Sequence, residues 1–307
     1  MYIFSIYLIN QKKFMKFKNH YNLLCFLAFV VFFSNYSLTS SYPEGDNWII
    51  SSPEEEGIKT ENINKLLDLS FSDNATQAVV IIKNGKIVSE RYADGYDINS
   101  HGTSWSMAKS YYAALIGISI DREEIKSLDD KVSMYLDYFD DERSSITLRD
   151  LLNMSSGLDF PSHEHERMFF QSDHLNYAKN VGVEKNAGIK FEYNNVNSML
   201  LGDILHKATG KKADLLFEER ILNVLEINDY KLWKDENGNV MTYCCVDMSA
   251  RDYSKIGLLF SRNGEWNGNQ ILSKEFIDET FQTVWETSNM NGHKRYCLLY
   301  TSPSPRD

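Results

Sequence analysis

The contrast between polar and apolar positions is sharpest at residues 105–120. A short polar segment leads there into residues 111–120, which are apolar apart from one glycine and one serine. A helix that is apolar on every face belongs in a protein core, and this one is too short to cross a bilayer. We therefore predict a buried helix that begins close to Ser106 and Lys109. Their spacing of three residues puts both side chains on one helical face.

The same pattern predicts the other main elements. Asn84-Gly85 between two apolar runs indicates a β-hairpin over residues 77–94. Its first strand, residues 78–82, is apolar on both faces and so needs cover on both sides of a sheet. Helices are expected over residues 60–70, 196–209, 253–263 and 274–281, and Gly210 is the expected end of the second.

The N-terminal residues 1–41 are typical of a signal peptide region. Lys16 and Lys18 precede the apolar run 23–33, and small polar residues fill 34–41, which is the order of a secretory signal. Met15 is a plausible true start, because residues 1–14 add nothing to this order. An uncleaved anchor is the alternative, but eleven apolar residues are few for a span. We expect an exported protein, secreted or periplasmic, that meets the membrane only through this segment.

Composition narrows the remaining classes. A chain of 307 residues with 43% hydrophobic content can form one large domain or two lobes. A net charge of −11 argues against binding to nucleic acid or to an anionic membrane surface. The adjacent Cys244 and Cys245 are interpreted as two thiols rather than a disulfide. His163 and His165 lie beside carboxylates, but no third metal ligand follows at motif spacing, so a solvated loop is favoured over a metal site.

Ser106 and Lys109 together permit nucleophilic catalysis. A serine hydroxyl needs a neighbouring base to remove its proton. A lysine can be that base if its pKa falls well below the usual value of about 10.4, and burial lowers it. The free N–H groups of a helix's first turn favour a developing oxyanion. The pair alone is weak evidence, since an ordinary helix start with a solvated lysine has the same spacing.

Three motifs in order carry a family resemblance. They are Ser106-Met107-Ala108-Lys109, then Leu151-Leu152-Asn153-Met154-Ser155-Ser156-Gly157-Leu158, then Tyr193-Asn194-Asn195. The set resembles the serine β-lactamase and penicillin-recognising hydrolase superfamily. It looks most like the class C β-lactamase-like hydrolases, in the branch of 6-aminohexanoate-dimer hydrolases and esterases. Segments 52–57 and 249–257 are smaller matches, and the resemblance covers about residues 47–282.

This resemblance implies an α/β (α+β) fold in which helices flank an antiparallel sheet, with a helical lobe attached. The domain would occupy residues 42–296. Its sheet lobe would take about 47–100 and 240–296, and its helical lobe about 101–239.

The resemblance also implies a role for each matched residue. Ser106 resembles the acylated nucleophile, and Lys109 the base that activates it. Tyr193 resembles the tyrosine that shuttles the proton to and from the leaving group, and Asn195 the residue that holds the substrate's amide. The alternative for the last two residues is an ordinary helix start with an asparagine cap.

One departure from the family pattern is the missing third motif, His-x-Gly or Lys-Thr-Gly, which lies on a late strand opposite the nucleophile. Residues 83–85 and 262–264 fit it loosely but are expected in turns. Residues 297–307 look like the translation of a sequencing adapter, so the natural frame is visible only to about residue 296. The C-terminal strands would then be missing, and residues 79–82 would lack a partner on one side. We expect this chain, as written, to be poorly folded and inactive.

For the complete gene product, the sequence predicts a serine hydrolase that acts on a carboxylic ester, a linear amide or a β-lactam without metal or cofactor. Its partner would be a small ester or amide, or a peptidoglycan-like substrate. A small ester or amide ranks first, because Trp105 and the loop after residue 150 look more like the esterase and amide branch. A penicillin-binding or peptidoglycan-sensing module of the same fold is the alternative. A structural helical protein with chance motifs is a third interpretation.

Overall fold

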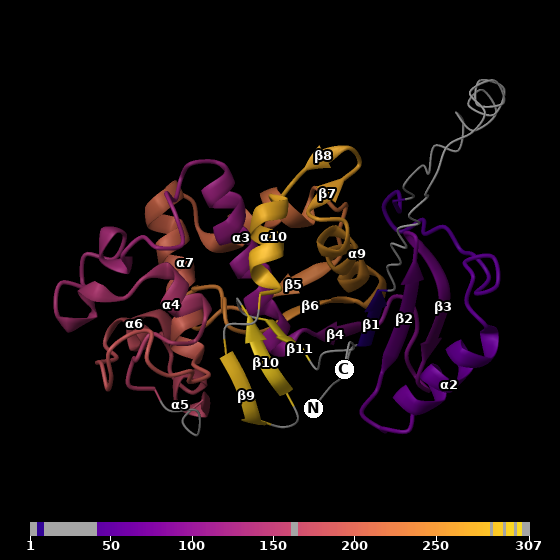
Figure 1. Ribbon diagram of the computed structural model, residues 1–307, viewed down its shortest axis with the longest axis horizontal. Helices are drawn as coiled ribbons and strands as arrows, with labels where there is room; N and C mark the ends of the chain where they lie inside the picture. Colours follow the sequence, from indigo (N-terminus) through magenta and orange to yellow (C-terminus); the bar gives the residue numbers. More distant parts are fainter. Residues whose placement is uncertain are drawn as a thin grey trace, which may run out of the picture. The chain divides into compact units, whose positions relative to one another are not determined.

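The computed structural model describes residues 5–8, 42–160, 165–282, 285–290, 293–297 and 300–302. The chain divides into two compact units, Met1–Ile98 and Asn99–Asp307. Figure 1 labels their helices and strands along the chain. Helices alternate with small, largely antiparallel sheets, which is the mixed architecture that the sequence predicts.

The described residues of the first unit contain a three-stranded sheet of order β1-β2-β3 and one helix of 11 residues. Its elements are β1 (Ser5–Leu8), α2 (Thr60–Ser70), β2 (Ala78–Lys83) and β3 (Lys86–Tyr92). The predicted hairpin is confirmed, because β2 and β3 pair antiparallel around Asn84 and Gly85, whose φ angles are 52° and 81°. Two consecutive positive φ angles are what a tight hairpin turn of the favoured hand requires.

The predicted free edge of β2 is not what the structure shows. Strand β1 runs parallel to β2, and its register extends from Ser5 opposite Val79 to Leu8 opposite Ile82. An apolar strand with an open row of N–H and C=O groups is a template for any extended segment, and residues 5–8 fill that position. Helix α2 packs against the same sheet: its Ile63 and Leu67 form one apolar cluster with Val79, Ile81 and Val88 of the strands.

The second unit contains most of the helices. They are η1 (Trp105–Met107), α3 (Ala108–Asp121), η2 (Val132–Met134), η3 (Glu142–Ser145), α4 (Leu148–Leu152), α5 (His165–Phe169), α6 (His174–Lys179), α7 (Asn195–Thr209), α8 (Ala213–Phe217), η5 (Glu218–Leu222), α9 (Ala250–Ser261) and α10 (Lys274–Thr280). The helices predicted at residues 60–70, 196–209, 253–263 and 274–281 are confirmed within a few residues as α2, α7, α9 and α10. Gly210 ends α7 with φ 74°.

The strands of this unit form small sheets. Strand β6 (Val246–Ser249) lies between β4 (His101–Thr103) and β5 (Tyr230–Leu232), antiparallel to both. The turn at Asn267-Gly268 joins β7 (Glu265–Trp266) to β8 (Asn269–Gln270). Residues 240–282 belong to the same compact unit as residues 101–239, and the predicted division into sheet and helical lobes stays a prediction.

Helix α3 is the buried helix that the hydrophobic pattern predicts. Most of its residues are buried, including Lys109 at its start. Gly117 lets α10 approach closely, since a Cβ atom there would lie 2.6 Å from the Phe276 ring. Figure 1 shows α3 and α10 side by side, with α7 on the other flank of α3.

The last described strands form a separate sheet, and the expectation that further strands follow residue 296 stays a prediction. Strands β9 (Trp285–Met290), β10 (His293–Cys297) and β11 (Tyr300–Ser302) form an antiparallel sheet of their own, of order β11-β10-β9. Strand β11 lies within residues 297–307, the segment interpreted as an adapter translation. A short run with alternating side chains can form a strand whatever its origin, so that interpretation stays a prediction.

Two other predictions concern residues outside those described. The apolar run 23–33 of the signal peptide is one of them, and His163 is the other. Among the helices that the structure describes, none is long and apolar enough to cross a membrane.

Candidate active site

Ser106 lies on an exposed turn that follows strand β4 of the β4-β6-β5 sheet. Strand β4 ends at Thr103, and Ser104 continues its pairing: its N–H donates to the Val246 carbonyl at 2.8 Å, and its Oγ accepts from Val246 N at 2.9 Å. Trp105 then adopts φ 45°, a left-handed conformation that turns the chain sharply into η1. As a result Ser106 is exposed, while Lys109 is only 2% exposed, one helical turn later.

The Lys109 amine is held between the serine and a backbone carbonyl. Its Nζ lies 3.2 Å from Ser106 Oγ and 2.6 Å from the Tyr243 carbonyl oxygen. It also lies 5.0 Å from the centre of the Tyr193 ring and 5.7 Å from that of Tyr243, within the range of cation–π attraction. No carboxylate among the described residues forms an ion pair with this amine.

Burial lowers the pKa of Lys109, because the charged ammonium loses its hydration, while Tyr193 opposes the shift through charge and hydrogen bonding. A lysine with a lowered pKa releases its proton more readily. In the neutral amine the contact with Ser106 can reverse, so that the hydroxyl donates and the amine accepts. The geometry thus suits a general base for the serine.

Tyr193 and Asn195 lie at the start of α7, and the helix cap there is Asn194. The Asn194 side chain accepts from the N–H groups of Val196 at 2.8 Å and Asn197 at 3.3 Å. Asn195 is therefore not needed as the cap. Its Oδ1 is buried, and the described part of the chain offers that atom no hydrogen-bond partner. A buried acceptor without a partner costs free energy, which a bound ligand that donates a hydrogen bond would recover.

The second motif supports this helix start. Met154, at φ 54°, accepts from Glu192 N through its carbonyl oxygen at 2.8 Å, and its Sδ lies 3.3 Å from Asn194 N. The Ser156 hydroxyl donates to Asn197 Oδ1 at 2.7 Å. Gly157 allows the loop to turn, because a Cβ atom there would lie 2.1 Å from the Lys185 carbonyl oxygen. The motif thus contacts the segment that carries Tyr193 and Asn195.

Sequence reasoning missed the segment that holds Lys109 from the other side. Tyr243 is buried, and its hydroxyl forms a 3.1 Å hydrogen bond with His174 Nδ1. Burial and, to a smaller extent, Asp235 raise the pKa of Tyr243. The Lys109–Tyr243 contact spans 134 residues, and no local signal in the sequence marks it.

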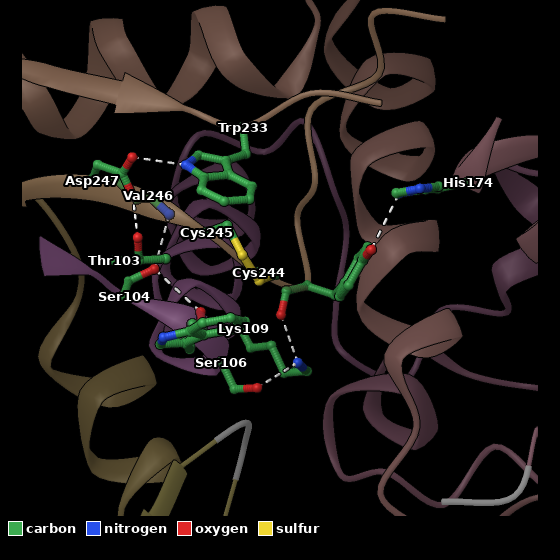
Figure 2. Close-up of a disulfide and its surroundings, with 12 residues drawn as sticks. Thr103, Ser104, Ser106, Lys109, His174, Trp233, Cys244, Cys245, Val246 and Asp247 are labelled. Atoms are coloured by element: carbon green, nitrogen blue, oxygen red, sulfur yellow. Dashed lines mark hydrogen bonds between the residues drawn. A yellow bond between two sulfur atoms is a disulfide. The ribbon is translucent and has the colours of Figure 1, made fainter. Parts of the chain in front are cut away.

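The interpretation of Cys244 and Cys245 as two thiols is wrong for this structure. Their sulfurs form a disulfide immediately after Tyr243 (Figure 2). Spacing in sequence is a poor guide to pairing, because the local backbone decides whether two side chains can meet. Here the φ of Cys245 is 73°, which is a rare left-handed conformation.

The sequence also contains two segments that loosely match the third motif, and possible metal ligands. Residues 84–85 and 263–264 form turns, as expected for segments that only loosely match the third motif. The described residues contain no cluster of three or more His, Cys, Asp or Glu side chains that could hold a metal ion.

Comparison with known proteins gives the family of the chain. The family model described as Beta-lactamase matches residues 73–258, which include Ser106, Lys109, Tyr193 and Asn195. The chain belongs to the Beta-lactamase family. No curated protein matches the chain.

Solved structures share the fold at low sequence identity. A protein from Bacillus anthracis assigned as a 6-aminohexanoate-dimer hydrolase is 23% identical, with a TM-score of 0.57 over 67% of this chain and 60% of its own. The octameric penicillin-binding protein homologue from Pyrococcus abyssi is 18% identical, with a TM-score of 0.65 over 80% and 65%. A D-stereospecific amidohydrolase from Streptomyces sp. is 17% identical, with a TM-score of 0.54 over 69% and 73%. The chain thus spans less than two thirds of the first two structures. These likenesses confirm the predicted β-lactamase-like fold.

Proposed function

We propose that the complete gene product is an exported serine hydrolase that cleaves a small ester or amide through an acyl-enzyme on Ser106. The observation that carries this proposal is the buried Lys109 amine, with a lowered pKa, 3.2 Å from the exposed Ser106 hydroxyl. Burying a charged amine without a carboxylate partner costs free energy. Such groups are concentrated at functional sites, where the amine serves a purpose. Activating an adjacent nucleophile is such a purpose.

The reaction has two steps. The neutral Lys109 takes the proton of Ser106 as the serine oxygen attacks the substrate's carbonyl carbon, and Tyr193 delivers a proton to the leaving alcohol or amine. Water then attacks the acyl-enzyme with its proton passing to the same basic groups, which releases the acid and restores Ser106. Asn195 would donate its amide N–H to the substrate or accept from it through Oδ1. No metal or organic cofactor takes part.

We rank an ester or a linear amide above a β-lactam as the substrate class. The half-exposed Trp105 indole, at 45% exposure beside Ser106, offers an apolar surface for a small acyl group. Two of the similar structures are named as a 6-aminohexanoate-dimer hydrolase and a D-stereospecific amidohydrolase, and these names support the ranking. A peptidoglycan-like peptide is the largest substrate that this class suggests.

The test begins with a long-read sequence of the gene across codon 296. We expect the frame to continue into a His-x-Gly or Lys-Thr-Gly motif, and we expect the 307-residue chain itself to be inactive. The extended protein would then be assayed with p-nitrophenyl butyrate and nitrocefin, with Ser106→Ala as the control. Rapid turnover of nitrocefin alone would reverse the substrate ranking.

A second assay separates a hydrolase from a sensor. A fluorescent penicillin or fluorophosphonate should label Ser106 in the extended protein, and the penicillin label should decay as water attacks it. A penicillin label that persists for hours, without turnover of either chromogenic substrate, would instead indicate a penicillin-binding module. Full activity in Ser106→Ala would exclude this residue as the nucleophile.

A further inference from the structure

The disulfide lies inside the segment that fixes the candidate catalytic lysine. Three successive hydrogen bonds join residues 243–246 to the turn that carries Ser106. The Tyr243 carbonyl accepts from Lys109 Nζ at 2.6 Å, Cys245 N donates to the Trp105 carbonyl at 3.3 Å, and Val246 N donates to Ser104 Oγ at 2.9 Å. Cys244 and Cys245 are the middle of this clamp, which we define as residues 243–246.

The clamp is anchored at both ends. At one end the Tyr243 hydroxyl meets His174, whose backbone N–H donates to Asp235 Oδ2 at 2.9 Å. At the other end, Val246 begins the central strand β6. Between these anchors the backbone of Cys245 adopts φ 73°, and its N–H donates to the Trp105 carbonyl. Figure 2 shows the disulfide between these contacts, with Lys109 and Ser106 below it.

A disulfide between neighbouring residues closes a small ring that includes their own peptide bond. Such a ring restricts the backbone of both residues, which is the restriction that Cys245 needs in a left-handed conformation that L-residues rarely adopt. When the ring opens, Cys245 is free to return to an ordinary conformation. The carbonyl of Tyr243 and the N–H of Cys245 would move with it.

We propose that the Cys244–Cys245 disulfide is a positioning element of the active site, so that its reduction to two thiols releases Lys109 and slows acylation of Ser106. The expected effect on acylation rests on the proposed function. The expected effect of the disulfide on the structure of the clamp does not. The reductant is a dithiol: its two sulfurs become a cyclic disulfide, and its two hydrogens and two electrons pass to Cys244 and Cys245, which become thiols.

The size of the effect follows from the geometry of general base catalysis. A displacement of about 1 Å between catalytic groups can slow a reaction roughly a hundredfold. Water that enters beside a released Lys109 would also return its pKa toward the ordinary value, since burial is the main cause of the lowered pKa and Tyr193 and Tyr243 are the groups that face it. We therefore expect acylation to slow between tenfold and a hundredfold at neutral pH, by the order-of-magnitude rule above.

The first experiment asks whether the disulfide exists. The full chain carrying Cys25→Ser and Cys297→Ser keeps only the vicinal pair, and neither replaced residue belongs to the site. The protein is denatured and alkylated with and without prior dithiothreitol, and its peptides are mapped by mass spectrometry. We expect alkylation of Cys244 and Cys245 only after reduction. Alkylation of both without reductant would overturn the proposal.

The second experiment reads the clamp without using activity. Hydrogen exchange of the 104–109 amides is compared between oxidised protein, reduced protein and a Cys244→Ser/Cys245→Ser variant. We expect faster exchange there in the reduced protein and the variant, with unchanged exchange in residues 78–92 as the internal control. Equal exchange at 104–109 in all three would refute a positioning role.

The third experiment measures labelling of Ser106 by a fluorophosphonate across pH in the extended protein, since the 307-residue chain is expected to be inactive. We expect slower labelling after reduction and in the double serine variant. In both, the pH at which the labelling rate increases should be higher than in the oxidised protein. An oxidised, folded protein that never labels would count against the proposed hydrolase alone, because the exchange result would still decide the clamp. Labelling at the same rate in both redox states would refute the catalytic part of the inference.

Discussion

Gly157 offers the sharpest test of how the second motif supports the site. It adopts φ 72°, and a Cβ atom there would lie 2.1 Å from the carbonyl oxygen of Lys185 and 2.9 Å from its carbonyl carbon. Gly210 provides a matched control: its φ is 74°, but no heavy atom lies within 4 Å of its Cβ position. Alanine at either position meets the same backbone strain, and only Gly157→Ala adds a collision.

The magnitudes can be worked from those two environments. A left-handed conformation costs an alanine about 1–2 kcal/mol, and the loss of chain entropy in the unfolded state returns about 0.4–1 kcal/mol. Gly210→Ala should therefore lower the free energy of unfolding by about 1 kcal/mol. The collision at Gly157 involves backbone rather than a flexible side chain, so we add about 3 kcal/mol, the upper end for overpacking. The expected loss for Gly157→Ala is about 4 kcal/mol.

Both substitutions are made in the extended protein, and urea unfolding followed by circular dichroism compares each variant with the unsubstituted extended protein as a shift of the midpoint at constant slope. The same proteins would be labelled at Ser106 and compared per folded molecule. We expect slower labelling only in Gly157→Ala, because its loop holds the start of α7. If the two variants unfold within about 0.5 kcal/mol of each other, the close approach to Lys185 does not exist and the supporting role assigned to the motif fails.

Three further predictions concern single side chains. Asn194→Ala removes the cap of α7 and should lower stability by about 1 kcal/mol in urea unfolding. The hydrogen bond from Arg220 holds the pKa of Glu124 below its usual range, so this stabilisation is complete above about pH 4.5 and is lost as acid protonates the folded carboxylate. Glu124→Gln should remove that acid dependence, measured as unfolding midpoint against pH. Lys109→Met should abolish acylation, and because burial lowers the pKa of Lys109, the parent chain should gain stability relative to this variant as pH rises toward about 10.4.

The parts of the site that the sequence could predict are local in the chain. The spacing of Ser106 and Lys109 and the apolar run after them predict a buried helix that begins close to both residues. The structure places Ser106 in η1 and Lys109 at the start of the buried helix α3. The Asn84-Gly85 turn and the end of α7 at Gly210 are equally local, because each depends on a backbone conformation that few residues adopt. Three motifs that are far apart in the sequence but occur in a recognisable order carried the family resemblance, which added Tyr193 and Asn195 to the predicted site.

What the sequence could not predict depends on contacts between distant segments. The carbonyl that holds Lys109 belongs to Tyr243, and a backbone group has no sequence signature. The disulfide next to it is accompanied by a left-handed Cys245, and no local sequence signal marks that conformation. The pairing of residues 5–8 with β2 is likewise set by an open strand edge.

That pairing leads to a last prediction, because β1 lies within the segment interpreted as a signal peptide. If export removes residues 1–41, β1 leaves with them, and the N–H and C=O groups of β2 that face away from β3 become open. We expect mass spectrometry of the exported protein to find an N-terminus after residue 41. A 42–307 chain should then show rapid hydrogen exchange at alternate amides of Val79–Ile82, those that do not pair with β3.

If the reading frame continues as we propose, the longer protein would show what replaces β1. If its additional strands complete the sheet, the same alternate amides of β2 should be protected in the exported, extended protein although residues 1–41 are gone, since an apolar strand edge is stable only when it is paired or covered. Protection of those amides in the 42–307 chain would show that the role given to the missing strands is wrong. An exported protein that still begins at Met1 or Met15 would show that the cleaved-signal interpretation is wrong.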